Sequence, residues 1–181
     1  MGPFYLSQAL GLDATRVGLV LAIGPLAAAV AGVPAGRMVD RFGAPRLVMA
    51  GLLVMAIGSL ALSMAPIALG ISGYALPIVV ITVGYALFQT ANNTATLADI
   101  GVAQRGVVSG MLNLLRNLGL ITGASAMGVV FAQATGTHDI TTARPEAMAT
   151  RMQASFTAAS ILIMVAIACA ARMPQRKDTI G

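Results

Sequence analysis

Charged side chains divide this chain into long apolar stretches, and the lengths of these stretches predict its helices. Between Arg46 and Asp99 lie 52 consecutive residues without a charged side chain. A helix that crosses a membrane needs about 20 apolar residues, so this stretch is too long for one crossing and fits two. The segment from Ala65-Pro66 through Gly73 supplies the turn between them.

Three further crossings follow from the rest of the chain. Two stretches of 20 uncharged residues each lie between arginines, and a longer apolar stretch is interrupted only by Arg116. Lipid offers no partner for free backbone N–H and C=O groups, so an open chain crosses it as helices. The period-2 alternation of barrel strands is absent. The sequence therefore predicts an all-α, polytopic membrane bundle, a single transmembrane domain over residues 1–181 with about five spans: 17–35, 47–65, 72–92, 107–131 and 152–171.

Composition agrees with a membrane protein. Charged residues make up 9% of the chain and hydrophobic residues 57%, whereas soluble domains carry about a quarter charged residues. Lys and Arg concentrate on one side of the predicted spans, where Arg37, Arg41, Arg46, Arg105, Arg172, Arg176 and Lys177 lie. The other side holds Arg16, Arg144 and Arg151. By the positive-inside rule, we expect the N-terminus outside and the C-terminus in the cytoplasm.

The same bias explains the net charge of +5 without a nucleic-acid partner. Cys/His clusters for a metal are lacking, as are phosphate-binding and nucleophile-elbow motifs, so no catalytic residues, metal or cofactor are predicted. The single Cys169 excludes an intrachain disulfide and is expected to be a packing residue. No signal peptide precedes the first span, and residues 3–10 look like the last turns of a helix that begins upstream. We therefore expect a fragment.

The segment after the first span has the form G-x-x-x-D-R-x-G, with Gly36, Asp40, Arg41 and Gly43 at the defined positions. Gly36 is expected to let a neighbouring helix approach, and Gly43 to permit a tight turn. Asp40 is expected to accept hydrogen bonds from helix-start amides, and Arg41 to hold a short basic loop at the cytoplasmic face.

This segment resembles the signature loop of the major facilitator superfamily of secondary transporters, although Ala44 and Pro45 replace basic residues usual in that family. Two other segments, residues 3–19 and 105–123, are similar to the fourteen-helix branch of drug:proton antiporters. The resemblance implies the C-terminal part of a multidrug-type exporter whose N-terminal half is missing. It further implies alternating access, proton exchange, efflux of small amphipathic or cationic compounds, and a bacterial plasma (inner) membrane.

Two polar helix faces are the candidate substrate or cavity sites. The first combines residues three or four apart on the third span: Tyr85, Gln89, Asn92, Asn93 and Thr96. These side chains either line a cavity or hydrogen-bond to other helices, and residues 92–99 are alternatively the helix's exit into water. The second face, on the fourth span, comprises Ser109, Asn113, Arg116 and Asn117.

Arg116 is the residue with the highest cost in lipid. If the helix begins near residue 107, Arg116 lies about 14 Å along it, near mid-bilayer, where an Arg costs about 2.5–3.5 kcal/mol on insertion scales. Such a residue is expected to face a protein or water-filled interior. If the helix begins nearer Leu112, Arg116 instead extends to the cytoplasmic interface.

Small residues one helical turn apart predict close helix contacts. Gly32 and Gly36 form such a pair in the first span, and Gly119 and Gly123 form another in the fourth. A role in gating is the alternative to packing.

No Asp or Glu lies within any predicted span. Proton-coupled pumps usually use a buried carboxylate, so the coupling residues are expected in the missing half and the chain is expected to be incompetent alone. The expected partners are the lipid bilayer, that N-terminal transporter half, a small-molecule substrate and protons. The alternative is a non-transporting small membrane protein, or a truncated gene product, that acts by helix–helix association.

Overall fold

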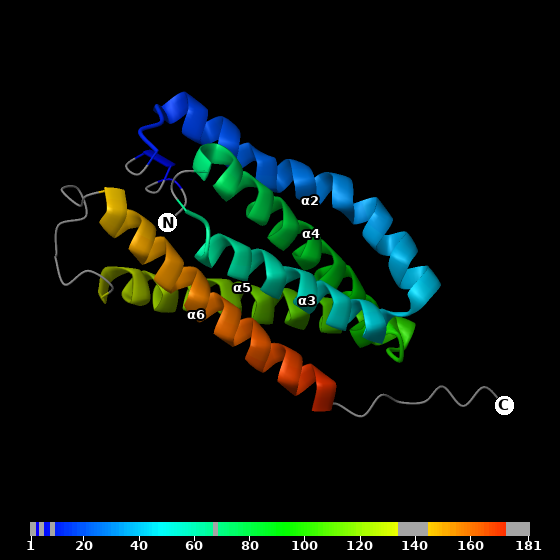
Figure 1. Ribbon diagram of the computed structural model, residues 1–181. Helices are drawn as coiled ribbons and strands as arrows, with labels where there is room; N and C mark the ends of the chain where they lie inside the picture. Colours follow the sequence, from blue (N-terminus) through cyan, green and yellow to red (C-terminus); the bar gives the residue numbers. More distant parts are fainter. Residues whose placement is uncertain (1–2, 4–5, 8–9, 67–68, 134–144, 173–181) are drawn as a thin grey trace.

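The chain folds into long antiparallel helices (Figure 1). The computed structural model describes residues 3, 6–7, 10–66, 69–133 and 145–172. Within these ranges it contains no strand, and its helices are α2 (Ala14–Phe42), α3 (Ala44–Ser63), α4 (Gly70–Leu97), α5 (Val102–Gln133) and α6 (Pro145–Arg172). Helix α2 begins at one end of the bundle and α6 finishes at the other. The all-α, five-helix prediction is confirmed.

Four of the described helices are long and apolar enough to cross a membrane: Ala14–Phe42, Ala44–Ser63, Gly70–Leu97 and Gln153–Arg172. Helix α5 carries three strongly polar side chains within its apolar stretch, Asn113, Arg116 and Asn117. Most helices extend beyond the predicted spans, since a helix can continue past the apolar segment that gives the hydropathy signal. The positions of the membrane boundaries themselves remain predictions.

A single residue, Gly43, separates α2 from α3. Its φ of 83° and ψ of 146° leave the helical region, and its N–H donates to the carbonyl of Val39 over 2.9 Å. Pro45 lies in the first turn of α3, where its missing N–H would have no helical partner in any case. Glycine is required here because a side chain makes this backbone conformation costly.

The expected short basic loop over residues 36–46 is therefore wrong in extent. Helix α2 continues through Arg37, Asp40 and Arg41 to Phe42, because nothing in this segment interrupts the i to i−4 hydrogen bonds. Charge signals where the chain leaves the lipid, which need not coincide with the end of a helix.

Helices α3 and α4 form the tightest pair of the bundle. A Cβ built on Gly51 would lie 2.6 Å from the backbone N of Phe88, and one on Gly84 would lie 2.8 Å from the backbone N of Met55. Gly58 repeats the pattern further along, with Ile81 as its neighbour. The two backbones can approach this closely only because these positions have no side chain.

Two small apolar clusters fill opposite ends of the bundle. One joins Leu6, Val17, Val20, Leu62 and Tyr74, and the other joins Ala35, Val39, Leu47, Leu87 and Ala91. Outside the clusters many large apolar side chains face outward, among them Val30 at 76% and Ile121 at 66% exposure. Apolar surface this extensive is expected to contact lipid or other protein segments rather than water.

Candidate functional site

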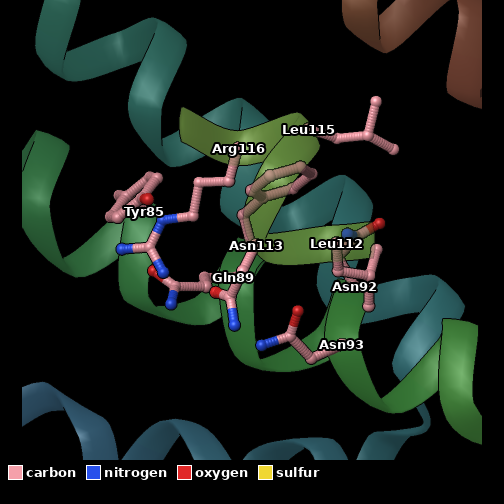
Figure 2. Close-up of a pocket in the computed structure, with 9 residues that line it drawn as sticks. Tyr85, Gln89, Asn92, Asn93, Leu112, Asn113, Leu115 and Arg116 are labelled. Atoms are coloured by element: carbon pink, nitrogen blue, oxygen red, sulfur yellow. The ribbon is translucent and has the colours of Figure 1, made fainter. Parts of the chain in front are cut away.

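The two polar faces predicted from the sequence meet in one pocket of about 320 Å³ between α4 and α5 (Figure 2). It is lined by Tyr85, Phe88, Gln89, Asn92 and Asn93 from α4 and by Leu112, Asn113, Leu115 and Arg116 from α5. The α4 residues follow an i, i+3, i+4, i+7, i+8 spacing, so they share one helix face. The volume lies within the range of small-molecule sites, about 300–1,000 Å³.

Among the described residues, Arg116 is the only charged one that lines this pocket. Its guanidinium carbon lies 5.8 Å from the centre of the Tyr85 ring, which is a cation–π arrangement. Figure 2 shows the Arg116 side chain extending to Tyr85, with the amides of Gln89 and Asn113 nearby. Helix α4 thus supplies the aromatic surface that orients a cation carried by α5.

The guanidinium receives no other fixed partner in the part of the chain that the structure describes. No hydrogen bond or ion pair there includes Arg116, although a guanidinium carries five N–H donors. The neighbouring amides of Gln89, Asn92, Asn93 and Asn113 contribute further N–H donors along with their oxygens. The pocket is consequently rich in donors, and none of its described lining residues carries a carboxylate.

Six of the nine residues on the two predicted polar faces line this pocket: Tyr85, Gln89, Asn92, Asn93, Asn113 and Arg116. Asn117 does not, because the next position along α5 is rotated by about 100° from Arg116. Thr96, which shares the sequence pattern, donates instead to the carbonyl of Asn92 over 2.8 Å. That these six residues contact a substrate remains a prediction.

The sequence analysis did not name Phe88, Leu112 and Leu115 as lining residues. The signal for Phe88 was its position on the same helix face, three residues after Tyr85 and four residues before Asn92. Leu112 and Leu115 lie one residue before Asn113 and Arg116. Apolar residues at such positions are so common in membrane helices that spacing alone does not distinguish lining residues from lipid-facing ones.

Helix α5 begins at Val102, ten residues before the later start at Leu112 that would have placed Arg116 at a helix end. Arg116 thus lies about 21 Å along the helix, at 1.5 Å per residue. Because a helix can begin well before the membrane boundary, the depth of Arg116 in a bilayer stays a prediction, and both positions of the span remain open.

The signature segment also differs from expectation. The carboxylate of Asp40 makes no hydrogen bond to the start of α3 within the described residues, and that helix start has no side-chain cap. Asp40 lies on α2 itself, so its expected capping role is not fulfilled here. The guanidinium of Arg41 lies 5.4 Å from the ring centre of the adjacent Phe42. Gly43 makes the turn that was predicted for it.

The glycines predicted to pack helices together have open space beside them. Apart from the adjacent backbone of the same helix, no atom of the described residues lies within 4 Å of a Cβ built on Gly32, Gly36, Gly119 or Gly123. Within the described residues, the close contacts instead involve Gly51, Gly58 and Gly84. The G-x-x-x-G spacing therefore did not identify the packing glycines of this bundle. Any packing at the open positions would have to involve another surface.

Together, the apolar antiparallel helices and the polar pocket between two of them define an integral membrane protein of the helical transporter class. A family model for the Major Facilitator Superfamily matches residues 1–179. The chain belongs to the Major Facilitator Superfamily, as the signature segment indicated. No solved structure matches it.

Three curated relatives are transporters by name. The chain is 33% identical over 138 residues to the uncharacterized transporter YebQ of Escherichia coli (strain K12). The matched region covers 75% of this chain and 30% of the relative. It is 27% identical to the multidrug efflux pump LfrA of Mycolicibacterium smegmatis, over 71% of this chain and 26% of the pump. It is also 27% identical to the riboflavin transporter RibZ of Clostridioides difficile, over 72% of this chain and 29% of that protein. The chain thus spans less than a third of these relatives.

Proposed function

We propose that this chain is the C-terminal part of a proton-coupled efflux transporter for small amphipathic compounds, and that the pocket between α4 and α5 is part of its substrate path. The pocket carries the proposal. A transport protein must hold its cargo inside the membrane, and polar side chains there are expected to face a protein interior or a water-filled cavity. Five amide or charged side chains and two aromatic rings meet in this one place.

Family membership supports transport as the general activity, and the name of the mycobacterial relative supports efflux of diverse compounds as the particular one. The pocket combines Phe88, Leu112 and Leu115 with amides and Arg116, so it suits a ligand with both apolar and polar parts. The transporter would act in the plasma membrane of a bacterium, with the N-terminus of this chain outside and its C-terminus in the cytoplasm.

Proton coupling is expected to depend on residues outside this chain. The predicted spans contain no Asp or Glu, while transport by alternating access needs two halves that rock around a shared site. In reconstituted vesicles with an imposed pH gradient, the isolated chain should therefore move no fluorescent amphipathic dye against its gradient. Uphill, gradient-dependent transport by the purified chain would contradict this and indicate a transporter built from several copies.

The positive test is a chimera in which this chain replaces the matched segment of the mycobacterial pump. We expect dye export above that of the pump truncated before the segment, because the chain would restore the missing part of the substrate path. Membrane insertion is measured in parallel by surface labelling. A well-inserted chimera without export would favour the second candidate, a non-transporting membrane protein that acts by helix–helix association.

The DNA upstream of the first codon separates the same two candidates. An in-frame extension that encodes further apolar spans supports the exporter, whereas a ribosome-binding site directly before Met1 favours the stand-alone protein.

A further inference from the structure

The charge of the pocket between α4 and α5 restricts what it can bind. Of the lining residues that the structure describes, Arg116 is the only charged one, and the other polar groups are uncharged. A cationic ligand would place two like charges close together, and their repulsion opposes binding. The pocket therefore disfavours organic cations.

An anionic group is the complementary ligand. The Tyr85 ring occupies one face of the guanidinium, which leaves the N–H groups at its edge free to bind a carboxylate or phosphate in two parallel hydrogen bonds. Within the described residues, no hydrogen bond or ion pair uses those donors. The adjacent amides of Gln89 and Asn113 can add N–H donors to the same anion.

We propose that the pocket between α4 and α5 selects substrates that carry an anionic group, which binds Arg116 while their apolar part contacts Phe88, Leu112 and Leu115. This inference rests on the proposed transport function, because only a transporter would make the bound compound a substrate. The binding itself needs only residues of this chain, so it is tested by equilibrium binding rather than by transport.

The probe is a matched pair of fluorescent xanthene dyes, of which one has a free carboxylate and the other its methyl ester. Binding to the 181-residue chain in phosphatidylcholine nanodiscs is measured by fluorescence anisotropy. We expect the carboxylate dye to bind at least about tenfold more tightly, a ratio that corresponds to the free energy of one charge-assisted hydrogen bond. Equal binding, tighter binding of the ester, or no binding of either dye would overturn the proposal.

Arg116→Gln should abolish the preference for the carboxylate. Arg105→Gln is the matched control, since it removes the same charge from an exposed position near the start of α5, outside the pocket. Asn113→Ala should weaken binding of the carboxylate dye, whereas Asn117→Ala, outside the pocket, should not. An effect of Arg105→Gln equal to that of Arg116→Gln would assign the preference to general surface charge and overturn the proposal.

An anionic lipid headgroup offers the same chemistry as an anionic substrate. Nanodiscs that contain phosphatidylglycerol separate the two sources. If Arg116 serves a substrate, the preference for the carboxylate dye persists in these nanodiscs. If the preference for the carboxylate dye disappears in both the wild-type chain and the Arg105→Gln variant, the lipid headgroup competes for Arg116. The site then belongs to lipid and the substrate proposal fails. Transport can fail in vesicles while this binding holds, so the two proposals are distinguishable.

Discussion

Two glycines of the signature segment, Gly36 and Gly43, have different physical roles although the motif names both. Gly43 has a φ of 83°, which side chains rarely adopt, and it joins two helices without any further loop residue. Gly36 lies inside α2 with no atom within 4 Å of a Cβ built on it. The backbone conformation requires glycine at Gly43 but not at Gly36.

Gly43→Ala should therefore lower the stability of the protein by about 1–3 kcal/mol, the cost of holding a side chain in a sparsely populated backbone region. Gly36→Ala is the matched control and should be neutral or slightly stabilising, because alanine favours helix by up to about 1 kcal/mol. Unfolding of the purified protein in mixed micelles, followed by circular dichroism, measures both variants. Equal losses would show that the strain at Gly43 is not what distinguishes them.

The surroundings of Arg116 come partly from its own helix and partly from the neighbouring helix. Its cost in lipid and its spacing from Asn113 are visible in the sequence and predict an inward-facing group. The ring of Tyr85, 31 positions earlier in the chain, is a partner that only the packing of α5 beside α4 provides. Spacing on one helix carries no information about the neighbouring helix.

At the scale of the helices, the contact between α3 and α4 is the best defined. Gly51 and Gly84 face each other across it, and each would place a Cβ within 2.8 Å of a backbone nitrogen on the other helix. Backbone atoms in a helix cannot shift as the end of a side chain can, so a methyl group at either position would force the two helices apart.

Gly51→Ala should destabilise the bundle by about 1–3 kcal/mol, as overpacking of a close contact does. Gly32→Ala, in α2 with open space around it, serves as the control and should change stability little. Thermal unfolding in detergent compares the two. If Gly32→Ala were the more harmful substitution, the G-x-x-x-G pairs of the sequence would be the true packing sites and the α3–α4 contact would lose its assigned importance.

At the scale of the whole molecule, the exposed apolar side chains and the five antiparallel helices predict a defined orientation in the membrane. The turn at Gly43 and the start of α4 lie at opposite ends of α3. The excess of Lys and Arg assigns the first of these to the cytoplasm and the second to the outside.

Cysteine labelling in intact cells tests this orientation in a Cys169→Ala background. An impermeant thiol reagent should label Ser72→Cys in intact cells but label Pro45→Cys only after permeabilisation, since both positions are exposed and lie on opposite sides. Permeabilised cells control for the reactivity of each cysteine. Labelling of Pro45→Cys but not of Ser72→Cys in intact cells would show that the protein has the opposite orientation.

Local composition was enough to predict an all-α membrane protein with five helices, because the transfer of side chains into lipid and the hydrogen bonding of the backbone are both local properties. The sequence also determined which polar residues share a face, because helical periodicity is local. The packing of the helices was needed to show that the faces of α4 and α5 line one pocket, that Asn117 lies outside it, and that Gly51 and Gly84 form the close contact. These features depend on how helices distant in sequence fit against each other, and that fit depends on the shapes of both surfaces at once.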